Sequence, residues 1–181
     1  FTIALTSDDA TLYVGGEFDQ IGTQARSKLA AIRTSDGTLT FFNPGFDDGD
    51  QTIEDDVLRL LLSPDNSILY VGGVFEAVSG QDRAHLVSFE TATGNLISWN
   101  PKVSFDYIHG RENVDLAFAL ALNQDNSVLY IGGAISSVGE GVTRVHNLVK
   151  FTPDGIYDPG FVSNIGDNLD TAECLLCPYV W

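Results

Sequence analysis

The sequence predicts an all-β protein built from three repeated antiparallel sheets, and three observations support this fold class. The pentapeptide Leu-Tyr-Val-Gly-Gly begins at Leu12 and returns at Leu69 and, with Ile for Val, at Leu129, at spacings of 69 − 12 = 57 and 129 − 69 = 60 residues. Each unit contains short apolar segments separated by turns rich in Asp, Asn and Gly, which is typical of β-hairpins. Apolar residues show no sustained 3.6-residue period, so we expect few helices.

The composition is that of a folded chain whose units depend on one another. Of the 181 residues, 44% are hydrophobic and 19% are charged, which is too apolar for a disordered protein. One unit is marginal as an independent domain, so neighbouring units must share apolar surface. The formal net charge of −16 argues against binding to nucleic acid or to an anionic membrane surface, because both favour Lys and Arg. No apolar run approaches the ~18 residues of a transmembrane helix, so we expect no direct membrane insertion.

The first two segments of each unit form a predicted hairpin. The first strand is apolar on both faces, at residues 3–5, 60–62 and 120–122. An Asp stands four residues before the repeated Leu in every unit, at Asp8, Asp65 and Asp125. Asp and Asn favour such turns because they hydrogen-bond nearby backbone and tolerate left-handed conformations. The pentapeptide is the second strand, and its paired glycines indicate a bulge or a backbone approached too closely for a Cβ atom.

A longer loop leads from the second strand to a third, and a second tight turn leads from the third to a fourth. The third segments are residues 29–32, 86–89 and 148–151, and the fourth are 39–42, 96–99 and 156–157. The turns between them read Ser35-Asp36-Gly37, Ala92-Thr93-Gly94 and Pro153-Asp154-Gly155, a strong hairpin signal between apolar runs. Each unit is therefore expected to be a sheet of four antiparallel strands.

A repeated four-stranded antiparallel sheet with long connections is the blade of a β-propeller, which has roughly four to eight blades. We predict three propeller-type blades, at residues 1–56, 57–115 and 116–171, in one partial or incomplete propeller-like domain. Residues 172–181 start a fourth unit, because the run from Cys174 to Pro178 corresponds to the run from Leu60 to Pro64. This tail is either a truncated blade or a swapped strand that completes another sheet, within the chain or in a partner.

Several of these segments resemble the delta-60 repeat. The matching stretches are residues 60–65 and 69–75, Arg83 with Leu86, residues 36–39, and Asp154-Gly155. The resemblance covers nearly the whole chain, with departures from the family pattern at Ile135, Thr93, Thr40 and Ser98. That family consists of propeller-like repeats common in large secreted or surface-attached bacterial proteins. The resemblance therefore implies an extracellular or cell-surface location, and it offers no catalytic residues to carry over.

The acidic connection after the first unit is the best candidate metal site. It contains Asp47, Asp48, Asp50 and Glu54. Calcium takes six to eight oxygen ligands, which a carboxylate-rich loop can supply. The spacing does not match the EF-hand loop, and the corresponding stretch of the third unit, residues 164–170, contains fewer acidic residues. The alternative is a solvated acidic loop, and we expect no cofactor other than calcium.

Aromatic residues of the fourth segments are candidates for binding. Trp99, Phe42 and Phe46 could form an exposed patch on which carbohydrate rings stack, or they could belong to the core of the outer strands. The tyrosines of the repeated pentapeptide indicate packing between blades, because they recur in every unit.

Arginines also recur once per unit, just before the third segment, at Arg26, Arg83 and Arg144. They predict a structural clamp in which each Arg pairs with a recurring acid such as Asp36 or Asp154. An anion-binding ring at one rim is the alternative.

The remaining reactive residues lack the pattern of a site. The three histidines, His85, His109 and His146, show no ligand spacing. Cys174 and Cys177 form one C-x-x-C pair, which does not complete a structural zinc site. We therefore expect both cysteines to be buried as small hydrophobic residues. The motifs of serine hydrolases, zinc proteases and phosphate-binding loops are missing from the sequence. We therefore expect no enzyme.

The favoured function is a non-catalytic extracellular or cell-surface module that acts as a scaffold or as an interaction surface for another protein or a glycan. One alternative is a structural subunit of a surface filament or layer, in which open blade edges pair between chains. A second is a fragment of a propeller enzyme, a lyase or hydrolase, with its site at the axial mouth. The chain has no Met and opens on a strand-like alternation, so we expect a piece of a longer protein.

Overall fold

The computed structural model describes residues 1–46, 56–105, 119–133, 135–139, 143–144, 147–152, 154–161 and 163. Every regular element among these residues is a β-strand, which confirms the predicted all-β class. The described strands form four three-stranded and two two-stranded sheets, in which all strand pairs are antiparallel. Among the described residues there is no helix long and apolar enough to cross a bilayer.

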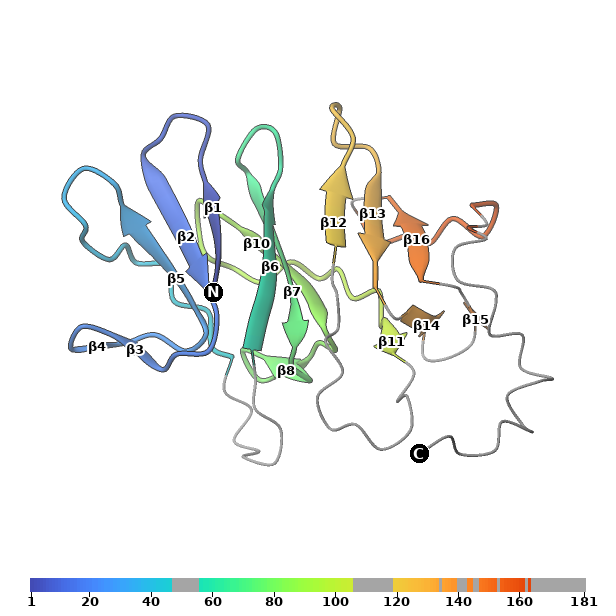
Figure 1. Ribbon diagram of the computed structural model, residues 1–181, viewed down its shortest axis with the longest axis horizontal. Coiled ribbons are helices and arrows are strands. Elements are labelled where there is room, and N and C mark those ends of the chain that lie inside the picture. The colour runs from blue at the N-terminus through green and yellow to red at the C-terminus, as the bar shows by residue number, and fades with distance from the viewer. Residues whose placement is uncertain are drawn as a thin grey trace, which may run out of the picture.

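Three main sheets share one strand order, and Figure 1 shows them side by side along the long axis of the molecule. The first sheet contains β1 (Thr2–Leu5), β2 (Thr11–Gly15) and β5 (Leu29–Arg33). The second contains β6 (Asp56–Leu62), β7 (Ile68–Val74) and β10 (Leu86–Glu90). The third contains β12 (Ala119–Leu122), β13 (Leu129–Gly132) and β16 (Leu148–Phe151). The strand that carries the repeated pentapeptide is central in each sheet.

The repeated tyrosine has the same register in all three main sheets. Its partners on the two neighbouring strands are Ala4 and Ala31 for Tyr13, Leu61 and Ser88 for Tyr70, and Ala121 and Lys150 for Tyr130. A register shift between Val57 and Arg59 interrupts the pairing of β6 with β7. The sequence repeat is therefore a repeat of hydrogen-bond register as well as of residues.

Small hairpins occupy the stretch where the sequence predicted a plain loop, and this expectation was wrong. They are β3 (Gln20–Ile21) with β4 (Gln24–Ala25), β8 (Ala77–Val78) with β9 (Gln81–Asp82), and β14 (Ile135–Val138) with β15 (Thr143–Arg144). A short strand from the second unit, β11 (Ser104–Phe105), pairs with β14 of the third. Gly22 and Gly80 make the first two turns with φ values of 60° and 71°, which suit glycine.

The fourth segments form isolated bridges rather than full strands. Leu39, Leu96 and Tyr157 each bridge to the third strand of their own unit. In the first unit, Arg33 and Thr40 donate backbone hydrogen bonds across this contact. The amide of Phe42 then donates to the Thr40 hydroxyl at 3.2 Å instead of to β5, so the chain turns away from the sheet.

The main sheets pack face to face. Side chains alternate along a strand, so each sheet has two faces. We call the one that carries the Leu of the pentapeptide the leucine face and the one that carries its Tyr the tyrosine face. One core cluster joins the tyrosine face of the first sheet to the leucine face of the second through Ala4, Tyr13 and Ala31 against Leu60, Leu69, Val71 and Phe89. A second cluster joins the second sheet to the third in the same sense, through Leu61, Tyr70 and Leu86 against Leu120, Leu129, Ile131 and Phe151.

An aromatic ring that follows the third strand contacts the tyrosine in every unit. The pairs are Tyr13–Phe42, Tyr70–Trp99 and Tyr130–Phe161, with ring centroids 5.2, 5.5 and 5.6 Å apart and edge-to-face geometry. Phe42 also lies 5.7 Å from Phe89 of the second sheet, so it links two units. Such pairs contribute about 0.5–1.5 kcal/mol beyond area burial. The predicted packing between units is confirmed for Tyr13 and Tyr70, whereas Tyr130 packs against Phe161 of its own unit.

The glycines of the pentapeptide lie where backbones approach closely. A Cβ atom on Gly15 would overlap the side chain of Val57 in the second sheet, and one on Gly73 would overlap the carbonyl oxygen of Asp56. The close approach predicted from the sequence is therefore present at both positions. Gly15 points across the contact between the first two sheets, which shows why the first unit needs glycine there, whereas a Cβ atom at the equivalent Gly132 would make only ordinary van der Waals contacts.

Candidate functional site

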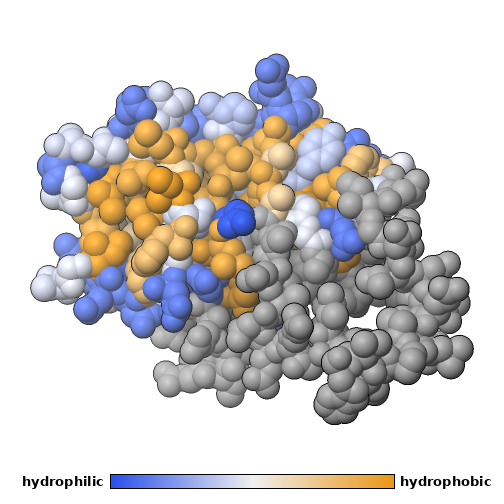
Figure 2. Space-filling view, viewed as in Figure 1, coloured by the Kyte–Doolittle hydropathy of each residue, from blue (hydrophilic) through white to orange (hydrophobic). Residues whose placement is uncertain are grey.

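The surface of the described residues contains apolar areas between polar ends. Figure 2 shows hydrophobic side chains gathered over the first and second sheets, with hydrophilic ones at the turns. The large hydrophobic residues that stand exposed are Phe1, Ile3, Leu5, Phe41 and Ile156. Ile3 and Leu5 lie on the leucine face of the first sheet and are 65% and 48% exposed.

A shallow depression of about 300 Å³ lies in the first unit between the small hairpin and the segment that follows the fourth strand. It is lined by Asp19, Ala25, Ser27, Asn43, Pro44 and Gly45. Asp19 of this lining forms an ion pair with Lys28 at 2.9 Å. A carboxylate, an amide and a hydroxyl beside apolar atoms can hold a small polar group such as a sugar hydroxyl. This depression was not predictable from the sequence, because its residues belong to no motif.

The three aromatic residues predicted as a binding patch lie in the core. Trp99 is 3% exposed and Phe42 and Phe46 are each 1% exposed, so no ring offers a face to a carbohydrate. Phe46 packs edge-on against Phe75 of the second unit, with ring centroids 5.1 Å apart. The prediction of an exposed patch is therefore wrong, and the alternative, a role in the core, is correct. The buried rings hold adjacent units together.

The predicted calcium ligands Asp47, Asp48, Asp50 and Glu54 lie outside the described residues. Just after them, the Asp56 side chain at the start of β6 is partly buried, and burial raises the pKa of its carboxyl group. Within the described part of the chain, no three His, Cys, Asp or Glu residues lie close enough to hold a metal ion. Calcium binding by the acidic connection stays a prediction.

The recurring arginines bind main-chain carbonyls rather than acids in the two units where their side chains are described. Arg26 donates to the carbonyl oxygens of Ala25 and Thr40, at 2.7 and 3.2 Å. Arg83 donates to the Asp82 carbonyl and to the Gln81 side chain, at 2.8 and 3.0 Å. The predicted pairing with a recurring acid was therefore wrong: Arg26 reaches the fourth segment at Thr40, whereas Arg83 bonds to the two residues that precede it. Asp36 instead accepts hydrogen bonds from Thr38 of its own turn.

The turn carboxylates have the structural role that the sequence predicts. Asp8, Asp65 and Asp125 each accept a hydrogen bond from the amide two residues ahead, at 3.1 Å in all three units. The residue after each Asp has a left-handed φ of 57° to 59°. Donors from Ser63 and Ser67 lower the pKa of Asp65 from 3.8 to about 2. These carboxylates are occupied in closing turns.

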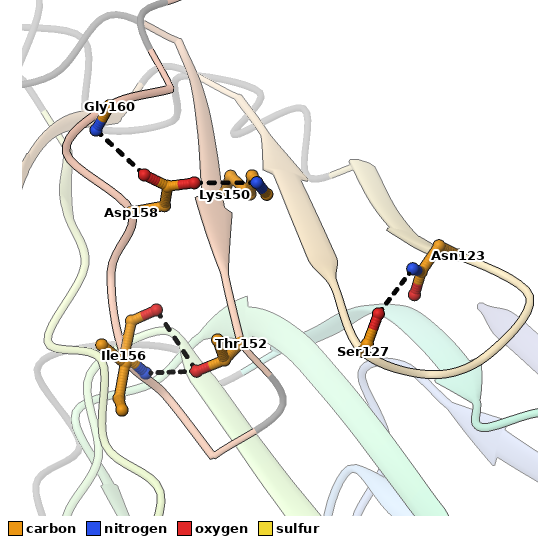
Figure 3. A network of polar contacts seen from close by, with 7 residues as sticks. All are labelled: Asn123, Ser127, Lys150, Thr152, Ile156, Asp158 and Gly160. Carbon is orange, nitrogen blue, oxygen red and sulfur yellow. Dashed lines mark hydrogen bonds and ion pairs between the residues drawn. The ribbon is translucent and has the colours of Figure 1, made fainter.

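Polar contacts of the third unit follow the same rule (Figure 3). Asn123 donates to Ser127 at 2.8 Å across the first turn of that unit. Lys150 pairs with Asp158 at 2.8 Å, and Asp158 also accepts the amide of Gly160 at 2.9 Å. The pKa of Asp158 is lowered first by the Lys150 ammonium. The network fixes the segment after β16 to the sheet.

Several buried polar atoms lie between the second and third sheets. The Tyr70 hydroxyl, the Ser88 hydroxyl and the Trp99 indole nitrogen are buried without a hydrogen-bond partner among the described residues. Burial raises the pKa of Tyr70 to about 12. Such groups cost stability unless they are satisfied.

His85 is the histidine that the structure describes. It has a left-handed φ of 63°, and burial lowers its pKa. His109, His146, Cys174 and Cys177 lie outside the described residues.

Comparisons with known proteins leave the family open. No family model matches the chain, and neither a curated protein nor a solved structure matches it. The resemblance to the delta-60 repeat therefore stays a prediction.

Proposed function

We propose that the chain is a non-catalytic extracellular or cell-surface β-propeller-like module that acts as a scaffold or as an interaction surface for a protein or a glycan. The observation that carries this proposal is the equal register of the three main sheets, together with the structural use of their recurring polar residues. Asp8, Asp65 and Asp125 close turns, and Arg26 and Arg83 donate hydrogen bonds to main-chain carbonyls. These repeated polar groups already make hydrogen bonds within the fold. We therefore expect the binding function to lie on surface residues that differ between the units.

The depression beside Asp19 and Asn43 is the best candidate for a small-ligand contact on this surface. Its carboxylate, amide and hydroxyl groups can hydrogen-bond to a sugar while Pro44 and Ala25 supply apolar contact. It stands beside the connection to the next unit, where residues differ between repeats. The acidic net charge and the resemblance to secreted repeats support the proposed location.

A glycan array probed with the whole chain tests this proposal. We expect binding that Ser27→Tyr removes, because a larger side chain fills the depression. Ser35→Tyr is the matched control, since Ser35 is an exposed turn residue of the same unit outside the depression. An array without hits contradicts the glycan form of the proposal. Hydrolysis or cleavage of an arrayed glycan by the chain contradicts its non-catalytic form.

A second candidate is a filament subunit that assembles through sheet edges. It is favoured by the fourth segments, because each bridges the third strand of its unit at a single position. The outer edge of each sheet therefore offers backbone groups that a strand of another chain could pair with. Electron microscopy of the concentrated chain should then show filaments, and Phe41→Pro should reduce them by removing a backbone donor from this edge. Phe41→Ala is the control. Isolated particles at every concentration contradict this candidate.

A further inference from the structure

The first and third main sheets each have one face that is complementary to a face of the other. The complementarity follows from the way in which the three sheets contact one another. Each internal contact joins a tyrosine face to a leucine face. The first sheet uses its tyrosine face and the third uses its leucine face. The leucine face of the first sheet and the tyrosine face of the third are therefore the two that neither core cluster uses.

Burial at equivalent positions supports this description of the first sheet. Leu69 and Leu129 are fully buried on the leucine faces of the second and third sheets, as are Val71 and Ile131 beside them. Their equivalents in the first sheet, Leu12 and Val14, are only partly buried. At the edge of the same face, Ile3 and Leu5 are 65% and 48% exposed. Large apolar side chains at such exposure on one sheet face mark an interaction site.

The third sheet shows the reverse pattern on its tyrosine face. Tyr13 and Tyr70 are 4% and 0% exposed, whereas Tyr130 is partly exposed. Ala121 is exposed, although its equivalent Ala4 packs under the second sheet. Lys150 also lies on this face and is already paired with Asp158 at 2.8 Å. Covering this face therefore would not bury an unpaired charge.

We propose that a second copy of this chain docks with its tyrosine face of the third sheet on the leucine face of the first. The contact would be head to tail, because it joins different faces of the two copies, and such contacts close into rings or continue as open stacks. Two copies that close on each other place six main sheets in one ring, within the roughly four to eight blades of propellers. The inference rests on the sheet faces alone and is independent of any ligand of the depression.

The mass of the chain in solution tests the contact. Sedimentation from nanomolar to submillimolar concentration should show a dimer or a larger head-to-tail assembly. The variant Ile3→Asp/Leu5→Asp should weaken association about a hundredfold or more, because it buries unpaired carboxylates. Ser35→Asp is the control, since Ser35 is an exposed turn residue outside the strands of both faces, and it should leave association unchanged. Circular dichroism confirms that each variant is folded.

Disulfide trapping distinguishes this contact from others. Two chains are prepared with Cys174 and Cys177 replaced by Ser, one carrying Leu5→Cys and the other Ala121→Cys. Oxidation should cross-link the mixture of the two and neither chain alone. A wild-type monomer at all concentrations overturns the proposal. Cross-linking of the Leu5→Cys chain with itself also overturns it, because that result places two leucine faces together.

Discussion

At the scale of single residues, the turns of the three units are held by side chains that the sequence repeats. The carboxylate of Asp65 accepts hydrogen bonds from the Ser63 and Ser67 hydroxyls at 2.6 and 2.8 Å. These donors stabilise the charged form and hold the pKa of Asp65 at about 2, below its ordinary value of 3.8. The role of this Asp is predictable from the sequence, because a turn needs an acceptor at that place.

The pH dependence of this turn follows from the sign of the pKa shift. The folded pKa is depressed, so the contribution of Asp65 to stability is present above pH 3.8 and is lost as the pH falls toward about 2. Carbon-13 NMR of the side-chain carboxyl groups should show Asp65 titrating near pH 2. Asp65→Asn should flatten the pH dependence of unfolding in this window. Titration of Asp65 near pH 3.8 would contradict the hydrogen-bond assignment.

The buried tyrosines allow a matched comparison between two units. The Tyr70 hydroxyl is buried without a partner among the described residues, whereas Thr91 lies beside the Tyr13 hydroxyl and counteracts the rise in its pKa that burial causes. Tyr70→Phe should therefore leave stability unchanged or raise it by about 1 kcal/mol, and Tyr13→Phe should lower it by about 0.5–1.5 kcal/mol. Urea unfolding of both variants measures the difference. Equal losses in the two would show that Tyr70 has a partner.

Alkaline pH gives a second test of Tyr70. Its folded pKa is raised to about 12 from 10.0, so the folded state holds this proton longer than the unfolded state does. The stabilisation is complete below pH 10 and is lost as the pH rises through about 12. Tyr70→Phe should remove this part of the alkaline destabilisation.

At the scale of elements, the tight approach of the sheets is concentrated at particular glycines. Gly15→Ala should destabilise the fold by about 1–3 kcal/mol, because its Cβ overlaps Val57 of the second sheet. Gly45→Ala is the control: nothing lies within 4 Å of its Cβ position, so the change should cost nothing or stabilise by about 0.4–1 kcal/mol. Thermal unfolding measures both. A neutral Gly15→Ala would mean that the first two sheets can separate.

The elements that were predictable are those with an apolar pattern or a strong turn signal. The hairpin from β1 to β2 is one, because Asp8 and Asp9 stand between two apolar runs. The hairpin of β3 and β4 was missed because strands of two residues, rich in Gln, give no apolar period. The length of the fourth strand was overestimated. The Thr40 hydroxyl accepts the hydrogen bond of the Phe42 amide, and the Phe42 ring then turns into the core.

The candidate site was harder to predict than the fold. The sequence favoured a core role for Phe42 and Trp99 over an exposed patch, but an apolar residue in an outer segment carries no sign of which face it takes. A structural role for the arginines was predicted from their recurrence, but the predicted acidic partners were wrong, because a main-chain carbonyl that accepts from an Arg leaves no signal in the sequence. The depression beside Asp19 depends on two segments meeting, which the sequence of either segment does not encode.

At the scale of the whole molecule, repulsion between like charges opposes the compact state. The formal net charge is −16, so NaCl should raise the unfolding temperature by screening repulsion between carboxylates. CaCl2 at matched ionic strength separates screening from binding at the acidic connection. A further rise with CaCl2, absent in a chain with Asp47, Asp48 and Asp50 changed to Asn, would support the calcium prediction. Equal effects of both salts would contradict it.

The constant order of faces has a consequence for how such a chain can change over evolution. A duplicated unit brings its own leucine face and its own tyrosine face, so it can be added between neighbours without a new contact being invented. Insertions are then tolerated where the faces are not involved, as in the differing spacings of 57 and 60 residues. The connections can therefore diverge between copies while the stacked faces stay the same. Units can thus be added through the sheet faces, whereas binding specificity can change through the connections between the units.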